Sequence, residues 1–220
     1  SSVESGSSNA LYVLNEKLDI IGSITDLAKG ERVYSVRFDK EIGYFVTFRQ
    51  VDPLFSADLS DPQNPKIIGK LKIPGFSNYL YPYGEGLLLG IGQDADEKTG
   101  RTGGIKLSMF DISNPANVTE GSKTILQENY SEALYSHKAV IIEKQKDIIG
   151  FSVYGNEGSE YHIYGFKNGQ FQRKAKIELG RAYGNIRGLY INNEFYIVTE
   201  NSVVVLNLDN FSKINELKLN

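Results

Sequence analysis

A short motif that closes a strand recurs along this chain, and its spacing is the strongest constraint on the fold. The aligned anchor positions are Asn15, Asp58, Asp111, Gly165 and Asn207, which lie 43, 53, 54 and 42 residues apart. Two of these anchors open closely similar sequences, Asp-Leu-Ser-Asp-Pro and Asp-Ile-Ser-Asn-Pro. A repeat of roughly 40 to 50 residues is typical of structural units that each hold four β-strands. We therefore expect a series of such units.

Short alternating runs of apolar and polar residues fill each unit, while helical periodicity is hard to find. The first unit has room for only two strands, and the following four units each have room for four. The predicted strands are 10–15 and 18–24; 33–38, 43–49, 53–58 and 66–72; 77–82, 87–92, 104–111 and 118–126; 134–142, 147–154, 160–166 and 171–179; and 185–191, 194–199, 202–208 and 213–219. Four-stranded sheets must stack to cover their faces, so the sequence predicts an all-β β-propeller of about four complete blades plus a partial first blade.

The domain organisation follows from the same pattern. Residues 1–9 are polar and Gly/Ser-rich, which is typical of a linker or of a cloning remnant, and residues 10–220 hold the blades. The partial first blade leaves two interpretations open. The chain is either a segment of a larger propeller, which we favour, or its open blade edges mediate self-association, because an unpaired strand edge attracts another strand.

Composition narrows the classes of partner. The formal net charge is -3, so no large basic surface is expected and nucleic acid is not predicted as a partner. The chain has no Cys, which excludes thiol catalysis, thiolate metal sites and disulfides. No apolar run approaches the roughly 18 to 20 residues that span a bilayer, so no membrane span is predicted.

Several segments resemble one known family. They are Asp58–Pro65, Gly69–Pro82, Leu87–Gly92, Asp94–Glu97 and Lys106–Pro115. This pattern, which covers about residues 33 to 143, resembles the secreted prokaryotic proteins with a C-terminal β-propeller domain distantly related to WD repeats. The resemblance implies a secreted or cell-surface attached protein, and it carries over no catalytic or binding residues. The last two units depart from the pattern because they lack the Asp-x-Ser-x-Pro turn, and the chain contains no Trp.

The predicted strand order sorts the connections between strands onto two faces. One face receives the longer loops, 74–78, 93–104, 127–133, 154–160 and 180–185. Recognition usually concentrates on such loops when a rigid scaffold holds them. We therefore predict a ligand-binding face made of Phe76, Asn78, Tyr130, Tyr154, Arg181 and Tyr183. Packing of these aromatic rings at the blade tops is the competing interpretation.

One loop of this face has the composition of a calcium site. Asp94, Asp96 and Glu97 precede a Gly, and oxygen ligands at alternate positions before a Gly suit Ca²⁺. The loop lacks the third ligand and the distal Glu of a helix-loop-helix site, so a solvated hairpin tip is the favoured interpretation. Calcium is the one cofactor that the sequence suggests.

No catalytic motif appears in the sequence. His137 and His162 both fall in predicted strands, and neither a nucleophile elbow nor a phosphate-cradling Gly motif is present. The leading prediction is a non-enzymatic extracellular module that binds or scaffolds a protein or cell-wall component. Two alternatives stay open: a glycan-active enzyme with dispersed carboxylates, and an architectural assembly domain.

Overall fold

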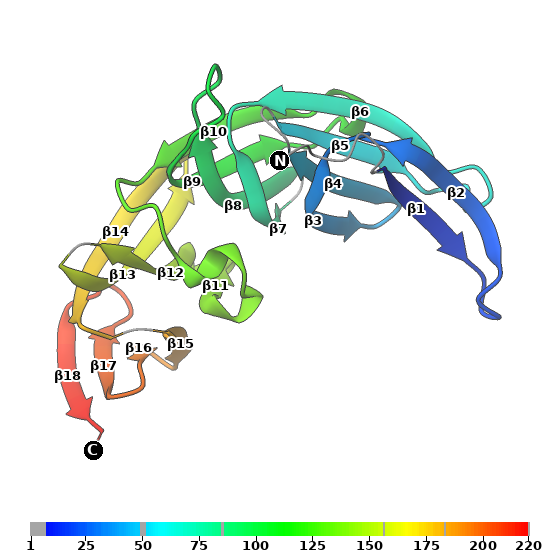
Figure 1. Cartoon of the computed structure of the whole chain (residues 1–220). Helices are drawn as coiled ribbons and strands as arrows, with labels where there is room; N and C mark the ends of the chain where they lie inside the picture. Colours follow the sequence, from blue (N-terminus) through cyan, green and yellow to red (C-terminus); the bar gives the residue numbers. More distant parts are fainter. Residues whose placement is uncertain (1–7, 49–51, 85, 156, 183, 220) are drawn as a thin grey trace. The chain divides into compact units, whose positions relative to one another are not determined.

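The computed structural model describes residues 8–48, 52–84, 86–155, 157–182 and 184–219, and β-strands dominate them (Figure 1). The chain divides into two compact units, Ser1–Gly121 and Ser122–Asn220, and each unit is described by itself. No helix among the described residues is long and apolar enough to cross a membrane.

The first unit begins with a two-stranded sheet and continues with four-stranded sheets. The first sheet pairs β1 (Asn9–Leu14) with β2 (Ile20–Leu27). The second contains β3 (Arg32–Asp39), β4 (Ile42–Phe48), β5 (Asp52–Asp58) and β6 (Lys66–Ile73) in chain order. The third contains β7 (Phe76–Gly84), β8 (Leu87–Ala95), β9 (Thr102–Asp111) and β10 (Thr119–Ile125), with the 3-10 turn η1 (Pro115–Asn117) before its last strand. The boundary between the two units, after Gly121, falls within β10.

The second unit holds two more four-stranded sheets, again with neighbours in chain order. Three 3-10 turns surround its first strand: η2 (Glu132–Leu134), η3 (His137–Ala139) and η4 (Lys144–Lys146). The first sheet contains β11 (Val140–Glu143), β12 (Ile148–Gly155), β13 (Gly158–Lys167) and β14 (Gln170–Gly180). The second contains β15 (Arg187–Ile191), β16 (Glu194–Val198), β17 (Ser202–Asn207) and β18 (Lys213–Lys218).

This architecture confirms the predicted all-β fold, with sheets of four strands connected as hairpins. One strand prediction is wrong. Residues 134–142 were expected as a single strand, but strand structure covers only β11, after the two turns η2 and η3. His137 therefore lies in η3 rather than in a strand. Ser131 explains the start of η2, because its hydroxyl accepts a hydrogen bond from the Ala133 amide and caps the turn. At the chain start, β1 already begins at Asn9, which places this residue in a strand rather than in the expected linker.

The core of the second unit lies between its two sheets. Ile148, Tyr161 and Ile163 come from one sheet, and Phe195 and Leu206 come from the other, and all five belong to one buried cluster. Burying an aliphatic or aromatic side chain of this size contributes about 1.5–3 kcal/mol. The middle strand β13 is therefore buried along most of its length, while the outer strand β14 is a mixture of exposed and half-buried positions.

The predicted turn chemistry is confirmed at the strand ends. The Asp58 carboxylate accepts hydrogen bonds from the Ser60 amide and hydroxyl, and Asp111 accepts one from the Ser113 amide. Asn207 accepts one from the Asp209 amide in the last sheet. Hydrogen bonding to Ser60 lowers the pKa of Asp58, because these bonds favour the charged carboxylate.

Candidate functional site

The residues of the predicted binding face lie in different environments. Phe76 is only 5% exposed and packs in the core of the first unit, with its ring centroid 4.7 Å from that of Tyr34. Phe76 is therefore a core residue of the first unit. Asn78 is half-buried within β7, and Arg181 is exposed. Tyr183 lies outside the described residues.

Tyr130 and Tyr154 do come together, and Tyr135 joins them. The ring of Tyr130 lies 5.4 Å from that of Tyr154 and 6.2 Å from that of Tyr135, measured between centroids. Tyr130 and Tyr135 are 49% and 65% exposed. With Gly184 the three rings line an open hollow of about 430 Å³. We call these three residues the tyrosine cluster. Tyr135 is not among the predicted site residues, because its position falls within the predicted strand 134–142.

Hydrogen bonds hold the tyrosine cluster in place. The Tyr154 amide donates to the Tyr130 carbonyl oxygen at 3.0 Å, and the Tyr154 hydroxyl accepts from the Gly184 amide at 3.2 Å. The hydroxyls of Tyr130 and Tyr135 are 3.2 Å apart, and this hydrogen bond raises the pKa of Tyr135. A phenol hydroxyl both donates and accepts hydrogen bonds, so the cluster offers a ligand both kinds of partner.

The acidic hairpin tip does not gather its three predicted ligands. Asp94 ends up within strand β8, and Asp96 and Glu97 are exposed in the turn that follows. The Asp96 carboxylate accepts hydrogen bonds from the Thr99 amide and hydroxyl and from the Lys98 amide. Hydrogen bonding to Thr99 lowers the pKa of Asp96. The geometry is that of a capped turn, and calcium binding here stays a prediction.

A different set of side chains does gather potential metal ligands. Within the described residues, Glu128, Glu160 and His162 form the one group whose ligand atoms all lie within 4.8 Å of one another. The Nε2 atom of His162 lies 2.9 Å from Oε2 of Glu160. The Nζ atom of Lys176 lies 2.8 Å from the other carboxylate oxygen of Glu160, Oε1. We call Glu128, Glu160 and His162 the acid–histidine cluster. The sequence could not reveal it, because the ligands come from separate segments.

Burial and hydrogen bonding set the charges in this cluster. Burial lowers the pKa of His162 and outweighs the opposing hydrogen bond with Glu160. Burial alone would raise the pKa of Glu160, but its hydrogen bonds with Lys176 and His162 together outweigh that effect and lower it. At neutral pH the cluster therefore contains an ionised Glu160 and a neutral imidazole.

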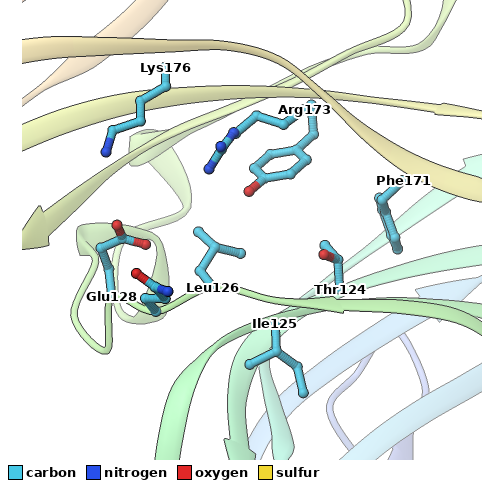
Figure 2. A pocket seen from close by; sticks show the side chains of 9 residues that line it. Thr124, Ile125, Leu126, Glu128, Phe171, Arg173 and Lys176 are labelled. Carbon is cyan, nitrogen blue, oxygen red and sulfur yellow. The ribbon is translucent and has the colours of Figure 1, made fainter.

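Two hollows open beside the cluster and share Gln127 and Glu128. The first, of about 430 Å³, is lined by Leu126, Tyr164 and Phe171 besides charged residues. Figure 2 shows the charged ends of Glu128, Arg173 and Lys176 pointing into this space. The second hollow, of about 420 Å³, is lined by Glu128, Tyr154 and Glu160 among others. Carboxylates thus line both hollows, and the cations Arg173 and Lys176 line the first.

Comparison with known proteins identifies related sequences. The family model described as "Beta propeller domain" matches residues 1–211. An uncharacterised protein of Archaeoglobus fulgidus is 42% identical over 211 residues, and the match covers 96% of this chain and 32% of that protein. An uncharacterised protein of Methanocaldococcus jannaschii is 35% identical over 214 residues, with the same two coverages, 96% and 32%. The chain thus spans about a third of the length of these curated relatives.

A solved structure is similar to the chain in fold. The crystal structure of BamB from Moraxella catarrhalis matches with a TM-score of 0.58 at 10% sequence identity. The match covers 98% of this chain and 62% of that one. At this level of identity the similarity concerns the arrangement of strands and carries no functional residue.

Proposed function

This chain belongs to the β-propeller domain family, and we propose that it is a non-enzymatic module that binds or scaffolds a protein or cell-wall component. The observation that carries the proposal is the tyrosine cluster. Tyr rings combine large contact area with few rotatable bonds, so they bind at low entropic cost. Such exposed rings around a hollow are typical of recognition sites on rigid scaffolds.

The support beneath the tyrosine cluster favours a preorganised surface. Ser131 caps η2 and its hydroxyl donates to the Ser152 carbonyl oxygen, while Glu132 pairs with Arg187. These contacts tie the segment that carries Tyr130 and Tyr135 to β12 and β15. A surface that is ordered before binding loses less entropy when the ligand arrives.

Binding assays with matched variants test the proposal. The 220-residue chain would be screened against an array of defined oligosaccharides and a panel of synthetic peptides. The expected result is a ligand class whose affinity falls roughly tenfold or more in the double variant Tyr130→Ala/Tyr135→Ala, because each ring would be a central contact. Tyr12→Ala is the control, since Tyr12 is a similarly exposed tyrosine (55%) in the first unit. Ligands that bind the double variant as tightly as the parent would refute the role of the tyrosine cluster.

We also propose that the module acts outside the cell. The support for this location is the resemblance of its turn motifs to secreted prokaryotic proteins. Fractionation of the native organism, with an antibody against this chain, would measure how the protein divides between medium, envelope and cytosol. Recovery in the cytosolic fraction alone would contradict an extracellular role.

A glycan-active enzyme is the second candidate, because Glu128 and Glu160 bring carboxylate oxygens within 4.8 Å of each other beside a hollow. Retaining glycosidases place two carboxyl groups about 5–5.5 Å apart. One of such a pair needs a raised pKa to act as an acid, whereas the pKa of Glu160 is lowered. Hydrolysis of aryl glycosides that is abolished in Glu128→Gln would establish the enzyme and displace the leading proposal.

An assembly role is the third candidate, because β1 has β2 as its one strand partner among the described residues. Tyr12 and Leu14 on β1 are also exposed, at 55% and 47%. An open edge with apolar side chains attracts a further strand. Light scattering coupled to size exclusion would show a dimer that Leu14→Lys dissociates. A monomer at all concentrations would exclude self-association through this edge.

A further inference from the structure

We propose that Glu128, Glu160 and His162 bind one divalent transition-metal ion, and that Zn²⁺ fits the site well. This metal site goes beyond the proposed binding function and does not depend on it. The tyrosine cluster and the metal site use different side chains, so each can fail without the other.

The positions of the ligands on the fold support the site. Glu160 and His162 are alternate residues of β13, so both side chains leave the same face of the strand. Glu128 comes from the connection between β10 and η2. Zinc ligands lie about 2.0–2.2 Å from the ion, which places neighbouring ligand atoms roughly 3.3 Å apart in a tetrahedron. Nε2 of His162 and Oε2 of Glu160 are 2.9 Å apart, and all three ligand atoms lie within 4.8 Å. A small movement of Glu128 completes the site.

The imidazole of His162 is held in place by its surroundings. The side chain is 0% exposed, and its Nε2 atom lies 2.9 Å from Oε2 of Glu160, so Nε2 is the ring nitrogen that faces this carboxylate. A ring that is already ordered loses little conformational entropy when an ion binds.

The ligand set selects the kind of metal. Ca²⁺ takes six to eight oxygen ligands, and this cluster offers two carboxylates and one nitrogen. Imidazole with carboxylates suits Zn²⁺ and its neighbours in the first transition row. Three protein ligands leave one tetrahedral position for water or for a ligand atom that enters from the adjoining hollows.

Lys176 occupies the place of a cation when no metal is bound. Its Nζ pairs with Glu160 at 2.8 Å, and it lies directly opposite His162 in the β13–β14 pairing. The Lys176 side chain is 40% exposed and flexible, so it can turn into solvent when a doubly charged ion enters. The metal and the ammonium group therefore compete for the same carboxylate. Removing this ammonium group should strengthen metal binding. The proposal therefore predicts the direction of the change in affinity.

Calorimetric titration of the untagged, chelator-treated chain with Zn²⁺ tests the site. The expected result is one ion per chain. Glu128→Gln should weaken binding roughly tenfold or more, because a neutral amide replaces an anionic ligand. Lys176→Ala should tighten it. Two controls should bind as the parent does: His137→Gln, which removes the other histidine, and Glu200→Gln, which removes an exposed carboxylate of the same unit.

A spectroscopic measurement distinguishes this site from adventitious binding. Co²⁺ in place of Zn²⁺ should give the visible absorption of a low-coordinate site with a nitrogen ligand, and His162→Asn should abolish it. Glu128→Gln remains informative if His162→Asn fails to fold, because Glu128 is only half-buried. Absence of saturable binding to the parent chain, or an unchanged affinity in Glu128→Gln, would overturn the proposal.

Discussion

The guanidinium of Arg187 donates two hydrogen bonds to the carboxylate of Glu132, one of 2.9 Å from Nη1 to Oε2 and one of 3.2 Å from Nη2 to Oε1. Glu132 belongs to η2 and is 5% exposed, whereas Arg187 begins β15. A paired fork of this kind fixes orientation as well as distance. The contact therefore joins the turn beneath the tyrosine cluster to the second sheet of the unit.

Glu132→Gln should lower the free energy of unfolding by about 2 kcal/mol, because it leaves the partly buried guanidinium without its counter-ion. Urea denaturation followed by tyrosine fluorescence measures the change. Glu157→Gln is the control, because Glu157 is an exposed carboxylate of the same unit. Equal stability of the two variants would mean that the ion pair contributes nothing net.

Glu120→Gln should destabilise the first unit by about 2–3 kcal/mol. Its partner Lys106 is 1% exposed, with Nζ 3.1 Å from the Glu120 carboxylate and 2.7 Å from the Pro74 carbonyl oxygen. The physical reason is that the buried ammonium group of Lys106 loses the negative charge of its carboxylate partner. The double variant Lys106→Met/Glu120→Gln should recover part of the loss, because no buried charge remains. A double variant whose loss equals or exceeds the sum of the single losses would contradict this explanation.

Gly188→Ala should destabilise the second unit by about 1–3 kcal/mol. A Cβ atom at position 188 would lie 2.0 Å from the hydroxyl oxygen of Tyr161, whose side chain is fully buried. Because protein interiors are close-packed, a fully buried ring can move aside only if its neighbours also shift. Gly155→Ala is the matched control, since the nearest atom to its Cβ, the Gly158 carbonyl oxygen, is 3.9 Å away. Thermal unfolding compares the two, and a smaller loss for Gly188→Ala than for the control would disprove the clash.

The stability of the first unit should fall as the pH rises from about 10 to 12. Burial, with a smaller contribution from Asp39, raises the pKa of Tyr44 to about 12 from its ordinary value of 10.0. Between these values the unfolded chain releases the phenolic proton while the folded chain retains it, so alkali favours unfolding. The loss attributable to Tyr44 is about 2 kcal/mol. Denaturant titrations at several pH values should show a shallower decline for Tyr44→Phe, and parallel curves would contradict the assignment.

Local interactions are the part of this structure that could be predicted from the sequence. Alternation of apolar and polar residues places most strands correctly. Within a strand, this alternation reflects which side chains are buried, and a few consecutive residues are enough to show it. The turns at Asp58 and Asp111 were predictable for the same reason, since their hydrogen bonds reach only two residues ahead. The strand prediction for residues 134–142 was wrong because the Ser131 cap and the turns η2 and η3 compete with strand formation there.

The number and order of the strands can be read from the amino-acid sequence, because period and alternation are properties of neighbouring residues. Which side chains meet depends on the tertiary fold. It buried Phe76 against Tyr34, and it brought Glu128 to a histidine 34 positions later in the chain. These contacts depend on how sheets pack and on where a connection crosses a strand. Contacts between residues far apart in the chain produce no repeating pattern in the sequence, so periodicity could not predict them.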